Sequence, residues 1–576
     1  MRRTNRRFPP LPVWLGRPNR WDLVAGALVF GALAAIIVVA RDMRMPLEML
    51  DTTPIVLDPA ALPGYAARTT LRMFAALALS LGFTFGVATL AAKNRRAEKI
   101  LLPLLDILQS VPVLGYLSFT VLLFLSLFPG SVLGAELAAI FAIFTSQVWN
   151  MIFSLYQSLR TVPHDMEEAA TAFHLTAWQR FWRLEVPFAV PGLVWNMMMS
   201  MSGGWFFVVA AEAIAVGTHT IDLPGIGSYV ALAIAERDLG AVGAALLAML
   251  IVIGLYDQLM FRPLVAWSDK FRLGETAAVE TPRSWLLTLL RRTHLVRSAG
   301  VPLRRHAHAI AMWRPTWRPP AVPLSRATRT RIADALYYGT LAALALTGAG
   351  LAVSLIAGIG IAEILHVLRL GFFTLLRVAL LMAIALAVWV PLGVLIGLRP
   401  RLAERLQPVA QFLAAFPANL LFPLAVVGIV HFRLDPDIWL SPLMLLGAQW
   451  YILFNVIAGA STVPNDLVEA ARSFHVRGWL WWRKVMLPAV FPYAVTGALT
   501  AWGGAWNASI VAEAVRWGDT HLVAQGLGAY ITLHTEAGDH ARIALGVIVM
   551  CLFVVILNRL LWRPLYDAAA RRFQVR

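Results

Sequence analysis

Apolar runs of about 20 residues, the length of a helix that crosses a lipid bilayer, recur along this chain. Hydrophobic residues make up 59% of its 576 residues and charged residues only 14%, against roughly 45–50% and about 25% in soluble domains. Six runs lie in each half: near 22–40, 70–92, 104–128, 133–157, 190–215 and 240–261, then near 335–357, 374–398, 409–431, 438–460, 491–515 and 541–562. The sequence therefore predicts an all-α polytopic membrane protein with about 12 transmembrane helices.

Prolines interrupt the third run of each half, at Pro103, Pro112, Pro408 and Pro417. Helices in lipid tolerate such kinks where neighbouring groups satisfy the freed backbone atoms, so we interpret both runs as spans. The first run follows six arginines, as the apolar part of a secretory signal peptide follows its positive region. Because the second half begins with a run of its own at the matching place, we interpret the first run as a retained span.

Basic residues mark one side of the predicted membrane. They collect in the N-terminal tail, at 93–99, at 399–405 and in the C-terminal RRFQVR, whereas the loops 41–67, 216–239 and 516–540 carry at least as many acidic residues. Cytoplasmic loops carry the excess of Lys and Arg, so we expect both termini to be cytoplasmic. The net charge of +17 is spread over these loops, which favours contact with the lipid bilayer and argues against nucleic acid as a partner.

The chain divides into four predicted segments: a cytoplasmic N-terminal tail at 1–20, a first six-helix unit at 21–264, a basic cytoplasmic linker at 265–333 and a second six-helix unit at 334–576. The linker contains eleven Arg and no acidic residue between Thr281 and Arg331. Within it, SWLLTLLRR at 284–292 predicts an amphipathic helix that rests on the lipid headgroups.

One polar segment occurs in both halves. Residues 161–192 align without a gap on 462–493, with twelve identities in 32 positions. The same offset of 301 pairs Trp205 with Trp506 and Glu212 with Glu513, and an offset of 305 pairs Arg72 with Arg377 upstream. Six spans are an even number, so both units enter the membrane from the same side and form two parallel six-helix repeats. Such a repeat suits a pore or cleft between two equivalent halves.

The repeated segment predicts a short helix after the fourth span of each unit. Two acids follow a proline at equal spacing in both copies, which resembles a capping box with Asp165 or Asp466 as the N-cap. Helical periodicity places on one face Met166, Ala169, Ala170 and Phe173, or Leu467, Ala470, Ala471 and Phe474. We expect an aromatic turn to follow and to stop before Pro187 and Pro488. Two such faces predict docking on a partner with two-fold symmetry, although interfacial anchoring by the tryptophans stays an alternative.

The residues themselves carry a family resemblance. EAATAFH…VPFAVPG and EAARSFH…LPAVFPY resemble the Glu-Ala-Ala signature of ABC importer permeases. VVAAEAIAVG with PGIGSYV, and IVAEAVRWG with QGLGAYI, resemble the nitrate, sulfonate, taurine and bicarbonate group of these permeases. The resemblance implies two fused permease units in a bacterial inner membrane. It also implies that two copies of an ABC ATPase bind the coupling helices and that an extracytoplasmic binding protein delivers a small-molecule solute.

The same resemblance assigns residues to the contact with the ATPase. These are Asp165, Glu168, Ala169, Ala170, Phe173, His174 and Pro187 in the first unit, and Asp466, Glu469, Ala470, Ala471, Phe474, His475 and Pro488 in the second. The family usually has Gly where His174 and His475 stand, so the resemblance leaves the bend and its docking geometry open at these positions. We expect each His to pair with a carboxylate or to cap a helix C-terminus rather than to sense pH.

The chain itself lacks the residues for ATP hydrolysis. It contains no Gly-Lys dipeptide and therefore no Walker loop, so we expect no enzymatic activity and no bound cofactor or metal, with ATP used by the partner subunit. Two other functions stay open: an ion-coupled secondary transporter of twelve spans, and a membrane scaffold that moves no solute.

Acidic residues inside spans are costly and indicate function. The predicted pathway residues are Trp205, Glu212, Trp506, Asn507 and Glu513. For the two carboxylates, a hydrogen bond between helices is an equally good interpretation. Asp106 and Glu136 have no counterpart in this alignment, and we expect them near the membrane interfaces.

Overall fold

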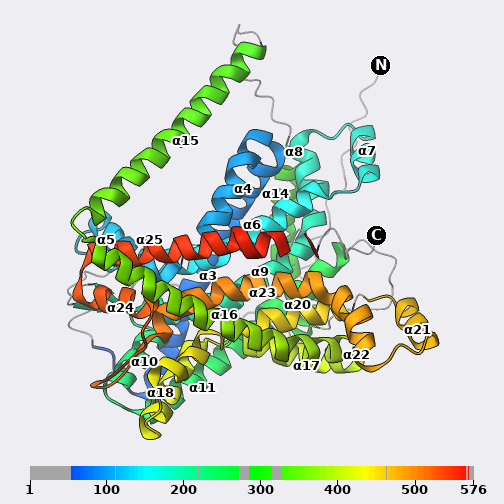
Figure 1. Ribbon diagram of the computed structural model, residues 1–576. Helices are drawn as coiled ribbons and strands as arrows, with labels where there is room; N and C mark the ends of the chain where they lie inside the picture. The colour runs from blue at the N-terminus through cyan, green and yellow to red at the C-terminus, as the bar shows by residue number, and fades with distance from the viewer. Residues whose placement is uncertain are drawn as a thin grey trace, which may run out of the picture.

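The computed structural model describes residue 31, residues 54–271 and 284–565 apart from 111, 217, 218, 314–325 and 462, and residues 568 and 569 (Figure 1). Seven helices in this part of the chain are long and apolar enough to cross a membrane, or up to nine if two bent pairs each count as one span. The predicted tail at 1–20 and the predicted first span near 22–40 lie outside the described residues, except for Gly31.

The first half is helical except for one β-hairpin. Its elements are η1 (Pro59–Ala61), α3 (Leu62–Lys93), α4 (Arg95–Ser110), α5 (Val113–Leu127), α6 (Val132–Arg160), α7 (His164–Ala172), α8 (Ala177–Arg180), η2 (Phe181–Glu185), α9 (Val186–Glu212), β1 (Ala213–Val216), β2 (His219–Asp222), α10 (Ile226–Ala235), α11 (Leu239–Tyr256), η3 (Asp257–Phe261), α12 (Arg262–Ser268) and η4 (Asp269–Phe271). The linker contains α13 (Trp285–Arg292) and α14 (His294–Met312). Helix α13 lies where the amphipathic pattern predicts a helix.

The second half repeats this order. Its elements are α15 (Arg326–Ile356), α16 (Ile361–Gly397), α17 (Pro400–Ala415), η5 (Ala418–Leu421), α18 (Phe422–His431), α19 (Pro436–Trp439), η6 (Ser441–Met444), α20 (Gln449–Ser461), α21 (Asn465–Ser473), α22 (Gly478–Trp481), η7 (Trp482–Met486), α23 (Leu487–Ala512), β3 (Ala514–Trp517), β4 (Thr520–Val523), α24 (Leu527–Ala537), α25 (His540–Leu557) and η8 (Asn558–Trp562). Figure 1 shows α15, at the predicted seventh span, extending away from the other helices.

Three predicted spans are not single helices. Pro112 separates α4 from α5, and at Pro417 the chain bends by 82° between Val409–Ala415 and Ala418–His431. A further bend of 43° divides the predicted span near 438–460. Proline has no backbone N–H to continue a helix, and in both halves it is the N-cap of the next element. Both third spans are therefore interrupted at one of the prolines noted in the sequence, Pro112 or Pro417, and their assignment as spans stays a prediction.

Helices of the two halves pack against each other at an interface. Helix α5 of the first half packs against α23 and α25, and α17 of the second half packs against α9. The side chain of Asn507 accepts a hydrogen bond from the backbone N–H of Val113 at 2.7 Å. The amide of Asn419 donates to the carbonyl oxygen of Phe206 at 3.2 Å. Because Phe206 is the repeat counterpart of Asn507, these two bonds lie at equivalent places on opposite sides of the interface.

An antiparallel hairpin follows the long helix of each half. Strand β1 pairs with β2 from Ala213 opposite Asp222, and β3 pairs with β4 from Ala514 opposite Val523. Figure 1 shows α10, α18 and α24 near one end of the long helices and α7 and α21 near the other. Both hairpins lie within or next to segments that were predicted as loops, 216–239 and 516–540.

Candidate functional site

The short helices α7 and α21 lie at equivalent places in the two halves. Each begins directly after a proline that serves as N-cap without a side-chain hydrogen bond, Pro163 or Pro464. The carbonyl oxygen of Pro163 already accepts a hydrogen bond from the N–H of Met166 at 3.1 Å. Asp165 therefore lies in the first turn and is not the cap. The predicted capping box is wrong, although an acid in the first turn still interacts favourably with the helix dipole.

One side of each short helix faces away from the protein. Ala170 and Ala471 are buried, with 6% and 7% of their surface exposed, whereas Phe173 and Phe474 are 79% and 81% exposed. The residues of the predicted apolar face therefore do not all point the same way, because the second alanine faces the protein and the phenylalanine faces outward. We call the outward residues the coupling surface: Glu168, Ala169 and Phe173 in the first half, and Glu469, Ala470 and Phe474 in the second. The two short helices thus expose the same aromatic side chain at the same place in both copies.

A buried ion-pair network joins three segments of the first half. The guanidinium of Arg72 on α3 contacts Glu136 on α6 through two bonds of 2.6 Å and Glu212 at the end of α9 through one of 2.7 Å. Arg72 and Glu212 have no exposed surface, and Glu136 is 3% exposed. Glu136 is therefore a buried partner of Arg72, and its expected position near a membrane interface stays a prediction.

The second half contains the same network with one shorter acid. Arg377 contacts Asp437 at 2.6 Å and Glu513 at 3.2 Å. Asp437 is the counterpart of Glu136 at the offset of 301, so the statement that Glu136 lacks one is wrong. Arg72 and Arg377, which pair at the offset of 305, were the sequence signal for this network. An arginine that becomes buried requires a carboxylate partner, so each half had to supply one.

Each network holds the adjoining hairpin and helix in place. Glu212 accepts a hydrogen bond from the N–H of Gly227 at 2.7 Å, and Glu513 accepts one from Gly528 at 2.7 Å. A Cβ atom at Gly225 or Gly526 would overlap the same carboxylate. The glycines of PGIG and QGLG therefore allow an acid to approach the N-terminus of α10 or α24 closely.

The predicted pathway residues separate into two groups. Trp205, Trp506, Glu212 and Glu513 have no exposed surface. Asn507 is partly exposed and bonds to the other half of the chain. For the two carboxylates, the geometry supports the alternative in which they hold helices together.

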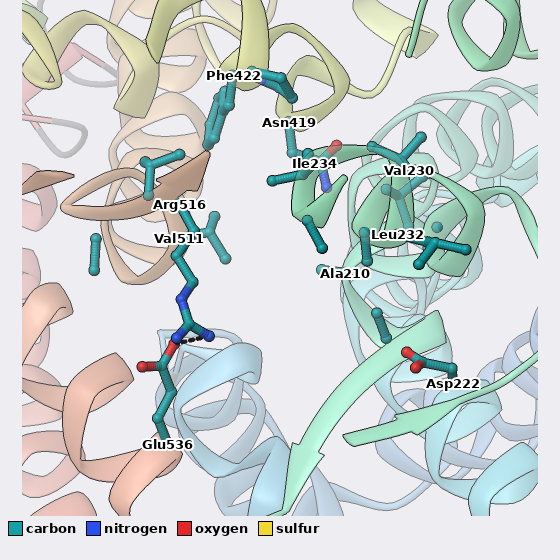
Figure 2. A pocket seen from close by; sticks show the side chains of 18 of the residues that line it. Ala210, Asp222, Val230, Leu232, Ile234, Asn419, Phe422, Val511, Arg516 and Glu536 are labelled. Atoms are coloured by element: carbon teal, nitrogen blue, oxygen red, sulfur yellow. Dashed lines mark ion pairs between the residues drawn. The ribbon is translucent and has the colours of Figure 1, made fainter. Parts of the chain in front are cut away.

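A cavity of about 1220 Å³ lies between the halves at the hairpin end (Figure 2). Its walls are largely apolar, with Val230 and Ile234 from one half and Phe422 and Val511 from the other. The charged and polar side chains around it are Asp222, Asn419, Arg516, Asp519, His521 and Glu536. None of these six residues was among the predicted pathway residues.

Most of the charges at the cavity are paired. Arg516 contacts Glu536 at 3.4 Å, and Asp519 contacts Arg237 at 2.8 Å. Figure 2 shows Asp222 across the cavity from the Arg516–Glu536 pair. Asp222 is exposed to the cavity, and desolvation by the surrounding protein raises the pKa of its carboxyl above the usual value, because it disfavours the charged form.

Comparison with known families identifies the repeat. The profile of the binding-protein-dependent transport system inner membrane component family matches residues 78–262 and again 389–574, together more than half of the chain. The chain belongs to this family. One match falls in each predicted unit.

Curated relatives of this chain are named for several different substrates. The nitrate import permease protein NrtB of Leptolyngbya laminosa is 29% identical over 187 residues, covering 32% of this chain and 63% of the relative. The bicarbonate transport system permease protein CmpB of Synechococcus elongatus is 31% identical over 186 residues, covering 32% and 64%. The glycine betaine/carnitine transport permease protein GbuB of Listeria monocytogenes is 29% identical over 248 residues, covering 43% and 74%. The chain thus spans less than two thirds of the first two.

His174 and His475 replace the glycine that is usual in this family, and both adopt the backbone conformation of a glycine turn. His174 and His475 have φ values of 51° and 55°, the left-handed region that glycine adopts most easily. The N–H of Leu175 bonds to the carbonyl of Ala170 at 3.1 Å, and the N–H of His174 bonds to that of Thr171 at 2.9 Å. These two bonds form a Schellman motif that ends the helix.

We expect His174→Gly to stabilise this turn by about 1 kcal/mol and His174→Val to destabilise it by a similar amount, because a left-handed conformation strains a side chain and most of all a β-branched one. The local measurement is the rate at which trypsin cleaves the nearby Arg180 in the purified protein. Slower cleavage is expected for the glycine variant and faster cleavage for the valine variant. Equal rates for all three proteins would show that the turn does not limit local opening.

Helices α8 and α22, which follow the turns at His174 and His475, continue into the long helices without a break. Ala177–Glu212 and Gly478–Ala512 are each one helical path that contains a π-turn, η2 or η7. The predicted stop before Pro187 and Pro488 is wrong, because each proline occupies the first turn after the π-turn, where a helix tolerates it. Helices α8 and α22 are thus rigidly continuous with α9 and α23, and one turn separates them from α7 and α21.

The π-turns η2 and η7 are stabilised by different interactions in the two halves. In the first half, buried Glu185 contacts Lys93 at 2.5 Å and Arg180 at 3.0 Å. At the equivalent position, the second half has the buried, apolar Met486. The described part of the linker also contacts α8: Trp178 donates a hydrogen bond to the carbonyl of Ile310 at 2.7 Å, whereas its counterpart Trp479 is 74% exposed.

Proposed function

We propose that this chain is the transmembrane permease of an ATP-binding cassette importer. The observation that carries the proposal is the repeated coupling surface, with an exposed phenylalanine and an exposed glutamate at the same place on α7 and α21. Two copies of a separate ATPase subunit dock there and hydrolyse ATP, since this chain has no Walker loop. The chain itself is not an enzyme and binds no cofactor or metal.

In this proposal the chain has twelve spans in a bacterial inner membrane. Two parallel units, at 21–264 and 334–576, have both termini in the cytoplasm, and the basic linker at 265–333 keeps them in a one-to-one ratio. The tail at 1–20 is cytoplasmic. The excess of Lys and Arg on the loops assigned to that side supports this orientation.

The cavity between the halves is the outer part of the solute pathway. It lies at the hairpin end, and an extracytoplasmic binding protein delivers a small-molecule solute to it. When the ATPase subunits close, they displace both coupling segments, and the continuous helical paths carry this displacement to the carboxylates that hold the hairpins. The halves then rock between outward and inward states.

The relatives do not select one substrate for this chain. Their names specify nitrate and bicarbonate, which are anions, and glycine betaine or carnitine. Since an anion and a zwitterion require different cavity charges, we assign the solute from the cavity rather than from these names.

Co-purification tests the proposed function. Tagged protein is extracted in mild detergent from its own membranes, and the bound chains are identified by mass spectrometry and tested for ATP hydrolysis. We expect an ABC ATPase at about two copies per chain, one for each coupling surface. A chain that is reproducibly free of ATPase would favour an ion-coupled secondary transporter, and an ATPase bound without solute uptake would favour a scaffold.

A further inference from the structure

The charged residues at the cavity occupy positions that the two halves do not share. Asp222 has Val523 as its repeat counterpart, and Glu536 has Ala235. Arg516 has Ala215 as its counterpart. Ala235 and Val523 also line the cavity. At the positions of Glu536 and Asp222, the other half therefore has an apolar cavity residue. The shared residues build the fold, and the unshared residues give the cavity its charge pattern.

Asp222 differs from the other carboxylates at the cavity. Glu536 contacts Arg516, and Asp519 contacts Arg237. Among the described residues, no side chain donates a hydrogen bond or forms an ion pair with Asp222. Its carboxylate points from β2 toward the open centre of the cavity in Figure 2. Within the part of the chain that the structure describes, Asp222 is thus the carboxylate at this cavity that lacks a cation.

We infer that Asp222 binds the ammonium group of a small organic cation or zwitterion in this cavity. This inference rests on the proposed function and names the substrate class for that pathway. A carboxylate with partly apolar surroundings attracts a cation more strongly than one in bulk water, because the local dielectric constant is lower. The apolar side chains of Val230, Ile234 and Phe422 line the same cavity and would contact the alkyl part of such a solute.

A simple inorganic anion fits this cavity less well. Arg516 is the arginine among the residues that line the cavity, and its guanidinium already contacts the carboxylate of Glu536 at 3.4 Å. An anion bound to Arg516 would therefore lie beside Glu536 and in the same cavity as the free carboxylate of Asp222, and like charges repel. A zwitterion avoids this conflict, since its positive end is neutralised by Asp222.

The test measures binding of tetramethylammonium to the intact complex in lipid nanodiscs, with sodium nitrate as the anionic probe at matched ionic strength. We expect tetramethylammonium to bind the wild-type complex, and Asp222→Asn to weaken this binding about tenfold. Asp539→Asn is the matched control, because it removes the same charge outside the cavity while asparagine retains the cap on α25. Its dissociation constant is expected to stay within about twofold of wild type.

A rescue variant separates binding from a structural effect. Val523 is the repeat counterpart of Asp222 and lines the same cavity, so Val523→Asp added to Asp222→Asn is expected to restore binding to within about threefold. The inference is overturned if tetramethylammonium does not bind wild type, if Asp222→Asn binds it unchanged, or if nitrate binds more tightly. Each of these results leaves the ATPase co-purification unaffected, so failure of the substrate class is distinguishable from failure of the proposed function.

Discussion

Replacing Arg72 by methionine (Arg72→Met) is expected to destabilise the protein by about 3–5 kcal/mol, because two buried carboxylates would lose their counter-charge. Arg72 has no exposed surface and contacts both Glu136 and Glu212. Methionine fills a similar apolar volume but leaves both acids uncompensated. The measurement is the thermal unfolding of purified protein, together with the amount of folded protein recovered from membranes.

The second half supplies the matched control, Arg377→Met. The side chain of Arg377 is 14% exposed and that of its partner Asp437 is 41% exposed, so water compensates part of the lost charge. We expect a clearly smaller loss of stability for this variant. A second control adds Glu136→Gln and Glu212→Gln to Arg72→Met and is expected to recover part of the loss. Equal destabilisation by the two arginine variants would contradict the argument from burial.

Reversing the charge of both coupling surfaces, with Glu168→Lys and Glu469→Lys together, is expected to abolish association with the ATPase. The side chain of Glu168 is 69% exposed, so the substitution leaves packing intact while it reverses the charge that a partner meets. At protein interfaces, like charges that face each other strongly suppress binding. The measurement is the ATPase recovered per chain after purification, together with solute uptake by cells.

Glu167→Lys is the control for this pair. It makes the same charge change on α7, but Glu167 is partly buried and its counterpart in the second half is Val468, so it does not belong to the repeated surface. We expect this variant to retain most of the ATPase. If the double variant keeps full ATPase and full uptake, the coupling surfaces are interfacial structure and the importer proposal loses its main support.

The positions of the structural features shared by both halves were largely predictable from the sequence. The repeated segment correctly predicted the short helices α7 and α21, and the offset placed Glu212 and Glu513 at equivalent sites. Details within these elements were not predictable. Which proline acts as N-cap, and which alanine is buried, depend on how each short helix packs against its neighbours.

The histidines at the bend show the same division. The resemblance indicated that glycine was missing at His174 and His475, which left the bend open. The structure has the left-handed conformation at both positions, because the two Schellman hydrogen bonds require it whichever residue is present. A backbone requirement of this kind follows from the hydrogen bonds around the residue and cannot be deduced from the residue type.

By itself, the sequence determined the apolar runs, the internal repeat and the polar segment that occurs twice, because these depend on composition and spacing along the chain. Only the tertiary structure decided that Arg72, Glu136 and Glu212 form one buried network, since their attraction acts across segments 64 and 140 residues apart. It also brought Asp222, Arg516 and Glu536 to one cavity from positions that the repeat does not share. Neither arrangement follows from local patterns, because burial and charge pairing depend on which helices pack together.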